Sequence, residues 1–264
     1  MGEDQTALLK HTLENIKIKI NIPTARELID LHKEFNTDNY APNRDEIRDE
    51  ISKRLIAPPY SDSKKNAGLE GRAGEPELRQ LYINNLIKNT KYKYSVETQT
   101  EKPYNFTNNN GNGRSGNIDL TIYSSESKKD NLKKSKLVNI EFKFYSLPKE
   151  ELKRDITKLV FEEINGILYL SKTNSNKSTI PNILEKLHKV FLSLKDKEFK
   201  SKDKDFSKIA DNKLVMIFIV VLKRMDIYYK VFDFNRANNN FNNYCEDFFV
   251  QSNFPALKIS EIKK

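Results

Sequence analysis

Two short stretches, NIDLTI at residues 117–122 and NIEFKF at residues 139–144, carry the clearest structural pattern in this chain. Both are rich in β-branched and aromatic residues, and both are predicted to be strands. Side chains alternate along a strand, so Glu141 and Lys143 point to one side while Phe142 and its apolar neighbours point to the other. The second stretch therefore predicts a strand with one charged face and one apolar face.

If the two strands are neighbours, Asp119, Glu141 and Lys143 share one face of the sheet. Two carboxylates and an ammonium group are costly to bury without a compensating ion, and a divalent cation removes that cost. Hard oxygen ligands suit Mg²⁺, and the lysine could orient or deprotonate a metal-activated water or counter charge on a phosphoryl group. The alternative is an exposed edge strand with Asp119 as a solvated neighbour. The pattern favours the metal site.

The rest of the chain predicts an α/β fold with a mixed central sheet flanked by helices. Helical spacing of apolar residues predicts a helical N-terminal region, residues 1–60, and a polar glycine-containing stretch at 61–74 begins a second unit, residues 61–264. Strands are expected at 92–100, 117–123, 137–145, 166–171, 214–222 and 227–234, and helices at 75–89, 148–163 and 181–194.

Composition restricts the classes of function that fit. Lys and Arg number 46 against 37 Asp and Glu, and the net charge of +9 favours a polyanionic partner, with nucleic acid ahead of an anionic membrane surface. The single cysteine, Cys245, excludes an internal disulfide and a cysteine zinc site, and it is expected to be a buried apolar residue. The most apolar run, 214–222, is too short to cross a bilayer. We expect a soluble cytoplasmic protein with no membrane partner.

The order of these residues resembles a known family. Asp119, followed on the next strand by Glu141, Phe142 and Lys143, is similar to the D…(D/E)xK signature of the PD-(D/E)xK phosphodiesterases, the restriction-endonuclease-like superfamily. The resemblance spans roughly residues 75–234. It departs from the family pattern where Ile118 replaces the proline before the aspartate.

The family resemblance extends to the two flanking helices. In the family, the helix before the first core strand often donates a glutamate to the metal. Glu75 is the candidate because it shares the core-facing stripe, with Glu77 as the alternative and a favourable helix-dipole charge as the simpler explanation. In the helix at 148–163, Asp155 and Lys158 followed by a leucine resemble a D-x-x-K-L motif of many members, although surface residues are the simplest interpretation.

The resemblance implies a restriction-endonuclease-like fold and a Mg²⁺-dependent endonuclease that hydrolyses DNA phosphodiester bonds, with Mn²⁺ able to substitute. Asp119, Glu141 and the backbone carbonyl of Phe142 would hold the metal, Glu75 would bind it directly or through water, and Lys143 would position the attacking water. A type II restriction or other phage-defence nuclease acting on double-stranded DNA as a homodimer is expected, with the N-terminal helices serving dimerisation or DNA reading. The alternatives are an inactive nucleic-acid-binding module and a structure-selective or ligand-activated nuclease.

Two basic segments are candidates for contact with the DNA backbone. GNGRSG at residues 111–116 matches a dinucleotide fingerprint, but it precedes a strand, so we expect a flexible loop in which Arg114 touches phosphate. A hairpin tip at 124–136 is expected to be either solvated or in contact with phosphates. Its candidate residues are Lys128, Lys129, Lys133 and Lys134.

Overall fold

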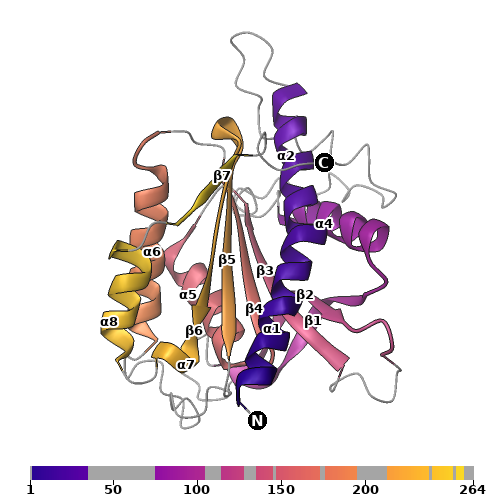
Figure 1. The fold of residues 1–264 in the computed structure, drawn as a ribbon, viewed down its shortest axis with the longest axis horizontal. Coiled ribbons are helices and arrows are strands. Elements are labelled where there is room, and N and C mark those ends of the chain that lie inside the picture. The colour runs from indigo at the N-terminus through magenta and orange to yellow at the C-terminus, as the bar shows by residue number, and fades with distance from the viewer. Residues whose placement is uncertain are drawn as a thin grey trace.

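A seven-stranded mixed sheet forms the centre of the protein, as seen in a computed structural model (Figure 1). The structure describes residues 2–34, 75–104, 114–127, 135–144, 147–172, 176–194, 213–237, 240–251 and 254–258. The strands lie side by side in chain order; β1, β2 and β3 are antiparallel, β3, β4 and β5 are parallel, and β5, β6 and β7 are antiparallel. Their bounds are β1 Lys93–Tyr104, β2 Arg114–Tyr123, β3 Lys136–Phe144, β4 Asn165–Lys172, β5 Leu214–Val221, β6 Asp226–Asp233 and β7 Ala256–Lys258.

Helices cover both faces of the sheet, and each face has its own apolar core (Figure 1). The first face carries α1 Gly2–Ile16, a π-helical turn Lys17–Asn21, α2 Ile22–Glu34 and α4 Glu75–Asn89. The second carries α5 Lys149–Phe161, α6 Thr179–Ser193, α7 Phe234–Ala237, α8 Phe241–Glu246 and a second π-helical turn, Asp247–Gln251.

The N-terminal helices belong to the first of these cores. Ile16, Ile20 and Leu28 are fully buried in the same cluster as Tyr82 of α4. The Tyr82 hydroxyl donates a hydrogen bond of 2.6 Å to the side-chain oxygen of Asn21. Residues 2–34 are therefore packed directly on the sheet, whereas the expected boundary near residue 60 lies outside the described residues.

The second core holds α5 close against the parallel strands. An added Cβ at Gly166 of β4 would lie 3.0 Å from the Leu159 Cβ, so the glycine permits this close approach. Leu152, Ile156 and Leu159 point from α5 into this core and are fully buried. The opposite side of α5 is consequently fixed relative to the sheet.

The predicted α/β class with a mixed sheet flanked by helices is confirmed. The predicted helix at 75–89 matches α4 exactly, and the other predicted elements differ from the observed ones mainly at their ends. The flexible loop expected at 111–116 ends earlier, because β2 begins at Arg114. The sequence did not predict α7, α8 or β7. None of the helices in the described ranges is long and apolar enough to cross a membrane.

Candidate active site

A separation between two neighbouring strands creates the candidate site. Pairing of β2 with β3 runs from Tyr123 and Lys136 to Leu120 and Ile140 and then ends. Beyond that point the first half of β2 pairs only with β1, and the second half of β3 pairs only with β4. The sheet therefore opens next to residue 119 on one strand and residue 141 on the other.

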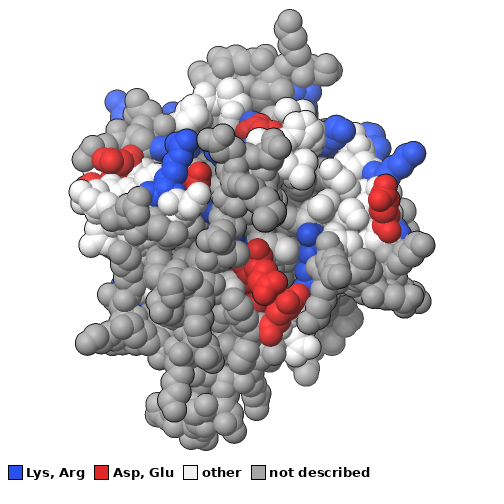
Figure 2. All heavy atoms as spheres, turned by 60° about the horizontal axis from the view of Figure 1, so that its bottom comes forward, with Lys and Arg blue, Asp and Glu red and all other residues white. Residues whose placement is uncertain are grey.

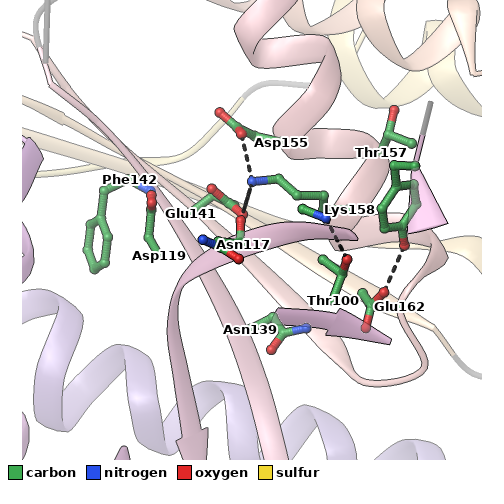
Figure 3. A network of polar contacts seen from close by, with 12 residues as sticks. Thr100, Asn117, Asp119, Asn139, Glu141, Phe142, Asp155, Thr157, Lys158 and Glu162 are labelled. Carbon is green, nitrogen blue, oxygen red and sulfur yellow. Dashed lines mark hydrogen bonds and ion pairs between the residues drawn. The ribbon is translucent and has the colours of Figure 1, made fainter. Parts of the chain in front are cut away.

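Side chains satisfy the backbone groups that this separation leaves without a strand partner. The backbone N–H of Phe142 donates to Asp119 Oδ2 at 2.8 Å (Figure 3). Lys158 Nζ donates to the backbone oxygen of Asn117 at 2.7 Å, and Arg79 Nη1 donates to that of Asp119 at 3.3 Å. Charged residues from β2, α4 and α5 thus meet at the opening.

Glu141 and Lys143 are buried in the interior of the sheet. Their residues are 1% and 6% exposed, and β3 lies between β2 and β4. The alternative of an exposed edge strand is therefore wrong. Asp119, which is partly exposed, lines the same pocket as both residues, so the alternation along the two strands correctly predicted that these three side chains lie together.

Two lysines connect the carboxylates of this cluster. Lys143 Nζ lies 2.9 Å from Asp155 Oδ2 and 3.5 Å from Glu75 Oε1. Lys158 Nζ lies 2.5 Å from Glu141 Oε1 and 3.0 Å from Asp155 Oδ1, as Figure 3 shows for these three residues. Asp155 is therefore shared between both ammonium groups.

The interpretation of Asp155 and Lys158 as surface residues is wrong, because the residues are only 7% and 8% exposed. The sequence contained a signal for their position that was not used. Glu151, Arg154, Asp155 and Lys158 follow the i, i+3, i+4, i+7 spacing of one helix face, and all four line the pocket. A charged stripe opposite an apolar stripe on one helix is compatible with a face that lines a polar cavity as well as with a face exposed to solvent.

Helix α4 contributes a second wall. Glu75, at its first residue, and Arg79, one turn later, both line the pocket, and Arg79 also forms an ion pair with Glu97 of β1. Sequence reasoning selected Glu75 but missed Arg79 and Glu97. Glu97 has a φ of +49°, a left-handed conformation that is uncommon for a residue other than glycine. The side chain of Glu77 lies outside the described residues.

The residues enclose a pocket of about 330 Å³. Its inner cluster of four carboxylates and two ammonium groups carries a formal excess of two negative charges. The full lining consists of Glu75, Pro76, Arg79, Glu97, Gly116, Asp119, Glu141, Lys143, Glu151, Arg154, Asp155 and Lys158.

Burial raises the pKa of three carboxyl groups in the pocket. The pKa of Glu141 is raised well above its usual value by desolvation and by the neighbouring Asp119 and Asp155. Desolvation also raises the pKa of Asp119, although the hydrogen bond from the Phe142 N–H opposes the shift. Desolvation raises the pKa of Glu75 to about 7, against the opposing attraction of Lys143. These carboxylates are destabilised as anions, so added positive charge is favoured here.

The remaining groups of the cluster are held in their charged forms. Burial alone would raise the pKa of Asp155, but Lys158 and Lys143 lower it below the usual value. Burial alone would lower the pKa of both lysines; Asp155 and Glu75 raise that of Lys143, and Glu141 and Asp155 raise that of Lys158. Both lysines therefore remain protonated at neutral pH.

The oxygens that remain suit a hard divalent cation held by two carboxylates. Within the described ranges, no group of three or more His, Cys, Asp or Glu side chains has an arrangement that could hold a metal ion. Both oxygens of Asp155 and both oxygens of Glu75 contact a lysine ammonium group, whereas Asp119 and Glu141 each use only one oxygen for a contact with a described residue. No hydrogen bond from a described residue reaches Asp119 Oδ1 or Glu141 Oε2. Magnesium commonly uses only one or two protein carboxylates, so the residues present fit this ion.

The candidate DNA-contact residues fall largely outside this description. Lys128, Lys129, Lys133 and Lys134 lie outside the described residues, and only the backbone of Arg114 is described, at the start of β2. On the face that Figure 2 shows, adjoining acidic side chains form one group near the centre, with basic side chains beside it. Cys245 is fully buried in the second core, as predicted.

Comparison of the chain with protein-family models, with curated proteins and with solved structures finds no match. Its function is therefore inferred from the chemistry of the pocket.

Proposed function

We propose that this chain is a Mg²⁺-dependent endonuclease that hydrolyses DNA phosphodiester bonds and is related to the PD-(D/E)xK superfamily. A type II restriction or other phage-defence nuclease is the form that we propose, with Mn²⁺ able to replace Mg²⁺. The proposal includes a homodimer, because two active sites are needed to cut both strands of a duplex.

One observation carries the proposal: Asp119, Glu141 and Lys143 line one pocket at the opening between β2 and β3. The three residues come from two strands, β2 and β3, that are separated in the sequence by the 12 residues 124–135. Glu141 is almost completely buried. Buried carboxylates with raised pKa values in a pocket are characteristic of functional sites. An assembly of this kind supports metal-dependent chemistry better than it supports a purely structural role.

The order of elements around the pocket also supports the proposal. Helix α4 is followed by the antiparallel strands β1, β2 and β3, then by α5, and then by β4 parallel to β3. The resemblance predicted this order of a helix, three strands and a helix, with Asp119 and Glu141 within strands. The restriction-endonuclease-like fold is thus part of the proposal.

Each residue of the cluster has a proposed role. Asp119, Glu141 and the backbone carbonyl of Phe142 would hold the metal. The Glu75 carboxylate is already paired with Lys143, so we propose that Glu75 would support the metal through a bridging water. A bound divalent cation supplies Lewis acidity to water and to the scissile phosphate.

Lys143 remains protonated in this environment, which restricts its role. It is suited to orient the attacking water and to counter negative charge on the phosphoryl group, and it is not suited to remove a proton. Asp155 fixes Lys143 at 2.9 Å, and Lys158 fixes Glu141 at 2.5 Å. Asp155 and Lys158 are therefore positioning residues.

The test is a cleavage assay with purified protein and duplex, single-stranded and branched DNA and RNA. Each substrate is incubated with Mg²⁺, Mn²⁺, Ca²⁺ or EDTA, and the product ends are sequenced. We expect cleavage of duplex DNA in Mg²⁺ and Mn²⁺ that leaves 5′-phosphate and 3′-hydroxyl ends. We expect binding without cleavage in Ca²⁺, because Ca²⁺ tolerates irregular coordination and activates water poorly.

The outcomes separate the alternatives. Equal cleavage in EDTA and Mg²⁺ would exclude the metal mechanism. Binding of DNA without cleavage in Mg²⁺ and Mn²⁺ would indicate an inactive nucleic-acid-binding module. Cleavage restricted to branched DNA, or to reactions supplied with a signal molecule, would indicate a structure-selective or ligand-activated nuclease.

A further inference from the structure

Two arginines line the pocket in addition to the lysines of the carboxylate cluster, and neither belongs to the signature that suggested the function. Arg79 comes from α4 and Arg154 from α5. These helices pack on opposite faces of the sheet, since α4 contributes to the first core and α5 to the second. The two guanidinium groups therefore approach the pocket from different walls.

Arg79 is held in a fixed position and still has donors available. Its Nη1 donates to the backbone oxygen of Asp119 at 3.3 Å and forms an ion pair with Glu97. A guanidinium group has five N–H donors in a planar fork. The contacts to Asp119 and Glu97 both use Nη1, so Nε and Nη2 have no partner among the described residues. The Arg79 side chain is 19% exposed, so these donors can reach a ligand in the pocket.

Arg154 has no partner at all within the described part of the chain. It is half-buried and lines a pocket that contains six carboxylates, yet it forms neither a hydrogen bond nor an ion pair with any described residue. An arginine remains charged at every pH relevant to proteins. Its guanidinium group is therefore available to an anion that the described chain does not supply.

We propose that Arg79 and Arg154 bind phosphates of the nucleic-acid backbone on either side of the reacting bond. This inference rests on the proposed nuclease function and specifies how its substrate is held. The planar fork of arginine matches a phosphate with two parallel hydrogen bonds. The full lining, with six carboxylates and four cationic side chains, keeps a formal excess of two negative charges that repels a phosphodiester. A bound divalent cation would neutralise that excess, and the guanidinium donors on the two walls would then hold the flanking phosphates. Arg79 and Arg154 thus bind substrate, while the metal and Lys143 act at the reacting phosphate.

The primary test uses Arg154→Gln, because this side chain has no described partner whose loss would disturb folding. The matched control is Arg236→Gln on α7, which removes the same charge from a 72% exposed side chain outside the pocket. The probe is a fluorescein-labelled DNA duplex in Ca²⁺, and fluorescence anisotropy gives the Kd. Arg154→Gln should raise the Kd about tenfold relative to the control, because a hydrogen-bonded charge contact is lost. The log–log salt slope should flatten by roughly 0.9.

Steady-state kinetics in Mg²⁺ separate a role in substrate binding from a purely structural role, because only the binding role changes KM alone. Arg154→Gln should raise KM and leave kcat unchanged, since the contact is made equally in the ground state and the transition state. Arg154→Lys should recover part of the affinity, because it restores the charge without the planar fork. Arg79→Gln should weaken binding as well, with thermal unfolding used to verify that its loss of the Glu97 contact leaves the fold intact.

The controls distinguish failure of this inference from failure of the proposed function. If the unmodified protein neither binds nor cleaves any nucleic acid, the proposed function is wrong and the arginine proposal falls with it. If the unmodified protein binds and cleaves DNA while Arg154→Gln and Arg236→Gln behave alike, only the arginine proposal is overturned. A change in kcat without a change in KM would also overturn it, because Arg154 would then act at the reacting group.

Discussion

The pairing of β4 with β5 and the pairing of β2 with β3 differ in how backbone polar groups are satisfied and in which side chains lie beside them. Pairing of β4 with β5 is unbroken from Gly166 and Val215 to Lys172 and Val221, and every residue of β5 is buried and apolar. Pairing of β2 with β3 stops at Leu120 and Ile140, and charged side chains fill the opening. The first arrangement minimises buried polarity, whereas the second concentrates it in one pocket.

The difference shows that burial of charge is not imposed by the fold. A strand inside this seven-stranded sheet can pair along its whole length with apolar residues on both faces, as β5 does. Buried ion pairs are often no more stabilising than apolar residues of similar volume, because the charged groups lose hydration. The carboxylates at the opening between β2 and β3 are therefore expected to contribute to function at little gain in stability. Four predictions test this contrast, in order of decreasing effect.

The largest expected effect is on stability and concerns β5. Phe218 is fully buried, with its ring centroid 5.0 Å from that of Tyr169. Phe218→Ala should lower the free energy of unfolding by about 3–5 kcal/mol. Glu141→Gln in metal-free buffer should change it little or raise it, because a neutral amide of similar volume replaces a carboxylate whose pKa burial raises. Urea unfolding of both variants measures the contrast, and equal losses would contradict it.

The second prediction concerns activity, for which the charged residues at the opening should matter most. Glu141→Gln and Asp119→Asn should lower the cleavage rate by more than about 100-fold, since loss of residues that merely support metal ligands already costs 10–100-fold. Both should lose Mg²⁺ binding by calorimetry. Lys143→Met should keep Mg²⁺ binding and lose cleavage, because it acts on water and phosphate.

Lys189→Met is the matched control for Lys143→Met. Lys189 lies on α6, with a side chain that is 62% exposed and pairs with Glu185. This control should retain both metal binding and cleavage. Cleavage that survives Glu141→Gln and Lys143→Met would mean that the active site lies elsewhere in the chain.

The contrast also explains how much the sequence could predict. Alternation along 139–144 correctly predicted that Glu141 and Lys143 share a side, and the helix at 75–89 was predicted to the residue. These features depend on local periodicity. The burial of Asp155 and Lys158 depends on where α5 packs, and the close approach of Leu159 to Gly166 fixes that distance. No local pattern encodes such an approach.

The opening itself was also beyond sequence-based prediction. Pairing of β2 with β3 ends at Leu120 and Ile140, but the residues next to them are equally compatible with strand pairing. Nothing in the two stretches therefore indicates where the pairing ends. Arg79 and Glu97 were missed for a related reason. Their contact joins α4 to β1, and it exists only because both elements border the opening.

The third prediction concerns pH and Glu75, whose pKa is raised by burial from 4.5 to about 7. Between these values the folded state binds a proton that the unfolded state has lost, so the free energy of unfolding falls as pH rises through this range. Glu75→Gln should lack this component, which the difference between the two unfolding curves isolates. If Glu75 supports metal binding, the Mg²⁺ affinities of the two proteins should differ at pH 8 and converge near pH 6. Parallel affinities at both pH values would exclude Glu75 from the metal site.

The smallest expected effect concerns Glu97, which lies beside the opening. In β1 its neighbours Val96 and Thr98 pair with Leu120 and Ile118, so Glu97 lies opposite Asp119. Its φ of +49° is unfavourable for a side chain that carries a Cβ, and glycine adopts it without strain.

Glu97→Gly should therefore change the free energy of unfolding by less than about 1 kcal/mol. Relief of the unfavourable φ offsets both the greater flexibility of the unfolded chain and the loss of a partly exposed ion pair with Arg79. Gln99→Gly is the matched control, since Gln99 is an exposed β1 residue without a positive φ, and it should lose about 0.5–1 kcal/mol. Thermal unfolding compares the two variants. A larger loss for Glu97→Gly than for Gln99→Gly would show that the ion pair with Arg79, and not the backbone conformation, dominates at this position of the pocket wall.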